Sequence, residues 1–132
     1  MICLKILHIS PIHVESGGYS RGHIDLAKEL LERGIESVFV IPEGNGVKDS
    51  MEEFGFRYHG IKKSSIGGLN TVSFELGIKR RLPKILEEER PDIVLTETVG
   101  SISTIAALKG SKNRIRTILW EKSPPTESSF LG

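Results

Sequence analysis

The sequence has almost no cysteine, few aromatic residues and no surplus of charge of either sign. Cys3 is the only cysteine, so an intrachain disulfide is excluded, and its apolar surroundings favour an inert buried thiol. We therefore expect a reducing, cytoplasmic location. The 18 basic residues nearly balance the 17 acidic ones. This balance leaves no overall field to attract a nucleic-acid backbone, so nucleic acid is not an expected partner.

A long hydrophobic run is also missing. Residues 1–9 are apolar but are interrupted by Lys5 and His8, and they are too short to cross a bilayer. They also lack the basic stretch followed by a long apolar stretch that marks a signal peptide. With 132 residues, of which 38% are hydrophobic and 27% charged, the sequence is typical of one globular domain.

Predicted strands alternate with predicted helices along the sequence. Short β-branched, apolar segments predict strands, whereas apolar residues at helical spacing predict helices. A helix of about four turns is expected between Gly18 and Gly34, Asp49 is expected to cap a short helix through about Phe54, and Pro83 is expected to kink or split the third helix. The expected strands are 2–10, 37–42, 55–61, 91–98 and 114–120, and the later helices are 71–90 and 100–110.

This alternation predicts an α/β fold, an open parallel sheet with right-handed crossovers and helices on both faces. Such a sheet binds ligands outside the carboxyl ends of its strands, where the strand order reverses. Function is therefore expected in the segments that follow the strands. These segments are 10–18, 42–46, 96–100 and 121–125.

The stretch "SPIHVESGGYSRG" places Gly17 and Gly18 between the first strand and the first helix. The free N–H groups at a helix start favour an anion, and residues without Cβ let a phosphate or sugar approach the backbone. A tight strand-to-helix turn can also require glycine without any ligand. The residues alone leave both interpretations open.

The two familiar nucleotide-binding motifs are absent. The glycines of "GGYSRG" do not have the offsets of G-x-G-x-x-G, although Glu43 stands where a ribose-binding acid would follow the second strand. No G-x-x-x-x-G-K-[ST] run occurs either. An NAD-dependent dehydrogenase is therefore disfavoured.

Taken whole, "KILHISP…GGYSRGHIDLAKELLERGIESVFVIPEG" resembles the N-terminal segment of retaining GT-B glycosyltransferases of the family 4 type. That family has a strand ending near a proline, a Gly-Gly loop, and a helix with the pattern R-h-x-x-x-L-A-x-x-L-x-x-R-G-H-x-V. The sequence departs at Ile35, where the family often has His. The segment "RPDIVLTET" resembles the family's "PDVVHAHS", and "IRTILWEKS" resembles its fifth strand. The first match is carried by Gly17, Gly18, Arg21, Leu26, Ala27, Leu30, Arg33 and Gly34.

The resemblance implies a Rossmann-like domain that is the N-terminal half of a two-domain enzyme. In this family the second domain binds most of the nucleotide-sugar, and the first supplies the Gly-Gly loop and the acceptor site. We expect residues 1–132 to form a single truncated domain that is inactive without the C-terminal donor domain or a partner subunit. The family's E-x7-E pair belongs to that second domain. The equal spacing of Glu89 and Glu97 is interpreted as chance.

By position in the resemblance, Gly17 and Gly18 would lie near the phosphate or sugar of the donor. Arg21, in the first helical turn, could reach an anion there. It could instead pair with Glu15 or Asp25 on the surface, and the sequence leaves this alternative open.

Further site residues are expected in the loops that follow the strands. His13 precedes the glycines and is a candidate ligand contact, whereas His8, inside a strand, is expected to be a satisfied core histidine. Glu97 and Glu121 are the catalytic candidates, because a carboxylate can help an acceptor hydroxyl to lose its proton. Both could also be solvated loop carboxylates. Lys122 stands where relatives often have a His that meets the sugar.

The expected function is transfer of a sugar from a nucleotide-sugar to a glycan or lipid acceptor, with no cofactor. No metal is expected, because the sequence has no D-x-D run and no His residues at ligand spacing. The alternative is a stand-alone nucleotide- or anion-binding module without catalysis. A basic run could touch anionic lipid at the inner membrane face, or it could pair with Glu87, Glu88 and Glu89 on a solvated helix face. The run comprises Lys62, Lys63, Lys79, Arg80, Arg81 and Lys84.

Overall fold

The computed structural model describes residues 4–10, 19–44, 47–62, 70–96, 101–110 and 115–119. Five strands and four helices alternate in this part of the chain, as the sequence predicts. They are β1 (Lys5–Ile9), α1 (Tyr19–Glu32), β2 (Glu36–Pro42), α2 (Val47–Phe54), β3 (Arg57–Ile61), α3 (Asn70–Glu89), β4 (Ile93–Thr96), α4 (Ser101–Lys109) and β5 (Arg116–Leu119).

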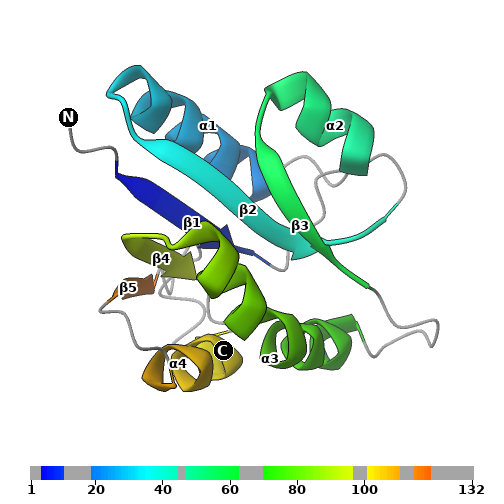
Figure 1. Ribbon diagram of the computed structural model, residues 1–132. Coiled ribbons are helices and arrows are strands. Elements are labelled where there is room, and N and C mark those ends of the chain that lie inside the picture. The colour runs from blue at the N-terminus through cyan, green and yellow to red at the C-terminus, as the bar shows by residue number, and fades with distance from the viewer. Residues whose placement is uncertain are drawn as a thin grey trace, which may run out of the picture.

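All strand pairs are parallel, and the strand order is β3-β2-β1-β4-β5. Helices α1 and α2 cover one face of the sheet, and α3 and α4 lie on the other (Figure 1). The α/β Rossmann-like class and the two helical layers are thus confirmed. The order also reverses between β1 and β4, because the chain moves outward through β2 and β3 and then returns to the other side of β1.

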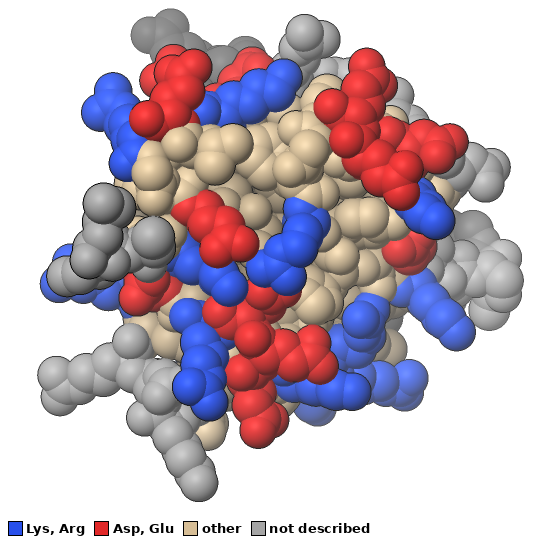
Figure 2. Space-filling model, turned by 45° about the horizontal axis from the view of Figure 1, so that its top comes forward, with Lys and Arg blue, Asp and Glu red and all other residues tan. Residues whose placement is uncertain are grey.

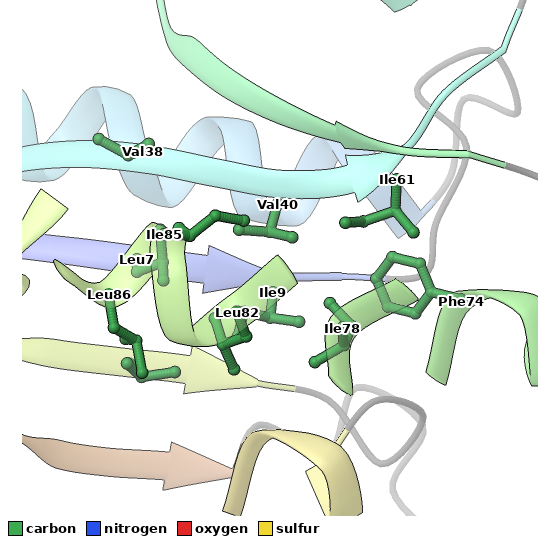
Figure 3. Close-up of a cluster of buried hydrophobic side chains, with 11 residues drawn as sticks. Leu7, Ile9, Val38, Val40, Ile61, Phe74, Ile78, Leu82, Ile85 and Leu86 are labelled. Carbon is green, nitrogen blue, oxygen red and sulfur yellow. The ribbon is translucent and has the colours of Figure 1, made fainter. Parts of the chain in front are cut away.

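The larger core lies between the sheet and α3. Alternate residues of a strand face opposite sides, so Leu7 and Ile9 of β1 point to α3 while His8 points to α1. Figure 3 shows the strand residues meeting a stripe on α3. These buried residues are Leu7, Ile9, Val38, Val40, Ile61, Phe74, Ile78, Leu82, Ile85, Leu86 and Val94.

The smaller core lies on the opposite face, under α1 and α2. Phe39 and Ile41 alternate with the residues of β2 that face α3, and they pack against Ile24 and Ala27 of α1 and Met51 of α2. Ile24 and Ala27 therefore form the inner face of α1, whereas Leu31, near the end of the helix, is 56% exposed.

Two local expectations need correction. Helix α2 begins at Val47, so Asp49 lies in its first turn and not at its cap. An acidic side chain in the first turn still interacts favourably with the helix dipole. Helix α3 continues through Pro83, so the split expected as one alternative is absent, whereas the kink expected as the other stays a prediction. Pro83 lies on the exposed side of the helix, so its ring does not displace any core residue.

Candidate functional site

The carboxyl ends of β1 and β4 meet at the reversal of strand order. Ile9 of β1 pairs with Thr96 of β4, and Ser10 follows directly. Ser10 and Thr96 are both buried, with 3% and 1% of their surface exposed. Two hydroxyl-bearing residues therefore close neighbouring strands at the edge where parallel α/β sheets bind ligands.

Six of the seven predicted site residues lie outside the described residues. They are His13, Gly17, Gly18, Glu97, Glu121 and Lys122. Arg21 is the third residue of α1, but its side chain is not among those described. Their roles therefore remain predictions.

The strands before these residues do end side by side. Residues 11–18 follow β1, Glu97 follows Thr96 of β4, and Glu121 comes two residues after Leu119 of β5. The three strands are consecutive in the sheet, and neighbouring strands lie about 4.8 Å apart. The chain thus leaves the sheet three times along roughly 10 Å of one edge.

His8 is a core histidine, as its place inside a strand predicts. It is fully buried and stacks on Phe39, with ring centroids 4.7 Å apart. Its neighbour, His23 of α1, is 2% exposed and was not predicted from the sequence. The four-residue spacing from His23 to the buried Ala27 was the available signal, because residues four apart share a helix face.

A second polar cluster lies at the opposite, amino-terminal edge of the sheet. The carboxylate of Glu89, the last residue of α3, lies 2.8 Å from Nη2 of Arg57, 2.7 Å from Nε2 of His59 and 3.3 Å from Nζ of Lys5. Glu89 therefore joins β1 and β3 to α3. Its side chain is 5% exposed, so it is the most shielded charge of the cluster.

The cluster keeps Glu89 ionised. Burial of the carboxylate opposes ionisation, but the hydrogen bonds from His59, Arg57 and Lys5 outweigh burial and lower the pKa of Glu89. The hydrogen bond to Glu89 correspondingly raises the pKa of Arg57. An open hollow of about 490 Å³ lies beside this cluster, lined by Glu52, Phe56, Arg57, Tyr58, His59, Glu88 and Glu89.

Glu89 lies away from the edge of the sheet where β4 ends. Glu89 lies at the amino-terminal edge of the sheet, whereas β4, which Glu97 follows, ends at the carboxyl edge. The Glu89 carboxylate is hydrogen-bonded to Lys5, Arg57 and His59, and these contacts hold the sheet to α3. The interpretation of the seven-residue spacing as chance is consistent with this arrangement.

Glu43 directly follows β2, and its side chain lies against β3. Its side chain crosses the face of β3 at Gly60, where a Cβ atom would overlap the carboxylate. Burial raises the pKa of the Tyr58 phenol, and the charge and hydrogen bonding of Glu43 raise it further. Glu43 also donates its backbone N–H to the carbonyl of Ile61, so its described contacts are with β3.

No helix among the described residues is long and apolar enough to cross a membrane. Within the same residues, no group of three or more His, Cys, Asp or Glu side chains could hold a metal ion. The absence of a metal requirement therefore stays a prediction.

The chain is similar to known glycosyltransferases. The model of glycosyltransferase family 4 matches residues 16–124. The sequence is 31% identical over 80 residues to the UDP-N-acetylglucosamine–N-acetylmuramyl-(pentapeptide) pyrophosphoryl-undecaprenol N-acetylglucosamine transferase of Fusobacterium nucleatum subsp. nucleatum, which covers 61% of this chain and 22% of that protein.

Two solved structures share the fold. A glycosyltransferase from Rickettsia africae ESF-5 superimposes with a TM-score of 0.65 at 23% identity, over 89% of this chain and 29% of that one. The UDP-GlcNAc 2-epimerase from Neisseria meningitidis superimposes with a TM-score of 0.57 at 17% identity, over 87% of this chain and 32% of that one. The chain thus spans about a third or less of the length of these three proteins, and the fold alone does not fix the reaction.

Proposed function

The chain belongs to glycosyltransferase family 4, and from that membership we propose that it is the acceptor-side domain of an enzyme that moves a sugar from a nucleotide-sugar to a glycan or lipid. The observation that carries the proposal is that β1, β4 and β5 end side by side at the edge where the strand order reverses between β1 and β4. Each of these strands leads into a segment with predicted site residues. One crevice can therefore receive a donor and an acceptor together.

The residues act in two groups. Gly17 and Gly18 let the donor phosphate or sugar approach the backbone, and Arg21 adds a positive charge beside them. Glu97 and Glu121 orient the acceptor hydroxyl, and one of them takes up its proton as the new glycosidic bond forms, the bond between the donor sugar and its phosphate breaks, and the nucleoside diphosphate leaves. His13 and Lys122 contact the sugars, and no metal is required.

A second domain, on the same polypeptide or on a partner subunit, supplies most of the donor site. This chain alone then binds acceptor but has no useful turnover. The proposal is supported by the share that the chain spans of the Fusobacterium transferase, 22%, and of the Rickettsia glycosyltransferase, 29%. A cytoplasmic enzyme that uses a lipid acceptor would also meet the inner membrane face.

The test uses the polypeptide encoded by the complete reading frame. It is incubated with UDP-N-acetylglucosamine, UDP-galactose, UDP-glucose or GDP-mannose and an extract of cellular lipids and glycans, and release of the nucleoside diphosphate is measured. Release with one donor, dependent on the extract, is expected. Absence of release with every donor would overturn the transferase proposal.

Glycine substitutions then test the role of the loop. Replacing Gly17 or Gly18 by Ala should raise the donor KM about tenfold or more, because a misplacement of about 1 Å in an active site can cost about 100-fold. Gly110→Ala is the matched control, since the nearest atom to its new Cβ would be a backbone oxygen 3.6 Å away. Equal effects of all three substitutions would contradict this role.

A further inference from the structure

A buried chain of hydrogen bonds joins α1 to the two strands beneath it. The Nδ1 atoms of His8 and His23 lie 3.2 Å apart, and Nε2 of His8 lies 3.0 Å from the hydroxyl oxygen of Ser37 on β2. His8, His23 and Ser37 are 0%, 2% and 4% exposed. Burial shields these contacts from competition with water, so breaking one is costly.

The two hydrogen bonds of His8 can form with either assignment of donor and acceptor. A neutral imidazole donates from one ring nitrogen and accepts at the other. If His8 donates to His23, its Nε2 accepts from the Ser37 hydroxyl. If His23 donates, His8 instead donates to the Ser37 oxygen. Both arrangements keep both contacts, so the link between α1 and the sheet holds whichever tautomers are present.

This link joins β1 to α1, two elements that follow each other along the chain. Ser10, just after β1, donates its backbone N–H to the carbonyl of Val40 on β2 at 3.0 Å. His23, the fifth residue of α1, is tied through His8 to Ser37 on the same strand. Both described ends of the connection between β1 and α1 are therefore fixed to β2.

We propose that the Ser37–His8–His23 chain is a positioning device that fixes the amino-terminal half of α1 relative to the carboxyl end of β1. His8 and His23 are positioning residues, because both are buried between α1 and the sheet. The inference rests on the proposed function, in which the residues joining these two elements meet the donor. In this role the two histidines hold α1 in place, and neither transfers a proton to the substrate.

His23→Leu and His23→Asn separate this task from simple packing. Leu removes the hydrogen bond to His8, whereas the Asn amide can replace an imidazole Nδ1. In the full-length polypeptide, hydrogen exchange is measured at the amides of residues 23–26 and 29–32, together with KM and kcat for the one of the four nucleotide-sugars that the wild type turns over. Ile78→Ala, in the core on the other face, is the control for a general loss of stability.

The expected result is local. His23→Leu should speed exchange at residues 23–26 about tenfold relative to residues 29–32 and raise KM about tenfold with little change in kcat, and Asn should restore both. Loss of donor binding without loss of kcat is the pattern of a displaced binding element. Ile78→Ala should change neither the local exchange ratio nor KM.

Two outcomes would overturn the inference. One is exchange that is unchanged, or raised equally along α1, in His23→Leu. The other is a KM that rises equally in His23→Leu and Ile78→Ala. If the wild-type polypeptide turns over no nucleotide-sugar, the proposed function fails, and the exchange ratio still decides whether the histidines fix α1.

Discussion

At the residue scale, Glu89 organises the charged side chains at the amino-terminal edge of the sheet. It is almost fully buried, while its partners Lys5 and Arg57 are 23% and 60% exposed. A buried charge depends on its partners more than they depend on it, because they retain access to water. The stability that this cluster contributes is therefore concentrated in the ionised Glu89 carboxylate.

Glu89→Gln should lower the free energy of unfolding at pH 7 by about 1.5 to 3 kcal/mol, the range for hydrogen bonds to charged groups. Because folding lowers the pKa of Glu89, its contribution is fully present above the unfolded-state value of about 4.3 and is lost as the pH falls through the folded-state value. Urea unfolding of both proteins at pH 7 and at acidic pH measures this.

Glu88→Gln is the matched control for this prediction. Glu88 is 51% exposed, and its contact with Lys84 is 3.9 Å long. Such a surface pair contributes at most about 0.5 kcal/mol. A difference between wild type and Glu89→Gln that stays constant from pH 7 into the acid range would contradict the assignment of the effect to the ionised carboxylate.

At the element scale, the contact between α3 and β3 depends on a glycine. A Cβ atom on Gly77 would lie 2.2 Å from Cγ2 of Ile61, a buried branch methyl that cannot swing away. Glycine in a helix interior normally costs about 1 kcal/mol relative to alanine. Here the close approach of helix and strand outweighs that cost.

Gly77→Ala should therefore destabilise the fold by about 1 to 3 kcal/mol, the range for overpacking a core, although Ala favours helix. Chemical denaturation of Gly77→Ala, Ile61→Ala and the double variant measures the coupling. The double variant should be more stable than the sum of the single losses predicts, because the methyl that meets the new Cβ has been removed. Additive losses, or a stabilised Gly77→Ala, would contradict this packing account.

The strands and helices themselves were largely predictable from the sequence. Apolar β-branched runs in β1 and β2 and the helical spacing in α1 and α3 report local periodicity, which needs no knowledge of distant residues. The exact start of α2 was missed because its first turn depends on contacts of Val47 with the core. The site was predicted only as a set of segments, since side-chain placement there depends on residues far apart in the sequence.

At the scale of the whole molecule, charge is dispersed. Figure 2 shows acidic and basic side chains spread together over the face in view. The exposed side of α3 departs from this pattern, since Lys79, Arg80, Arg81 and Lys84 are all exposed and only Lys84 has a helical acidic partner, Glu88, among the ion pairs described. The pairing of this basic run with Glu87, Glu88 and Glu89, one of the two expectations from the sequence, is therefore present in part, between Lys84 and Glu88.

If the acceptor is a lipid, this side of α3 should contact anionic membranes. Lys79→Gln/Arg80→Gln should weaken binding to phosphatidylglycerol vesicles about tenfold or more at low salt, since each basic residue near the surface contributes about 1 kcal/mol. Vesicle sedimentation measures this. Arg33→Gln/Lys109→Gln removes the same charge from the ends of α1 and α4, and equal weakening by both pairs would contradict a specific face.

The sequence by itself determined the order of strands and helices, the family, and the segments where function is expected, because each depends on local pattern or on contiguous motifs. The tertiary structure decided what the isolated residues do. It joined Glu89 to Lys5, 84 residues away, and His23 to His8, and it showed that Gly77 makes room for Ile61. These pairings arise only when strands and helices pack, since a buried charge, imidazole or methyl is defined by its neighbours in space.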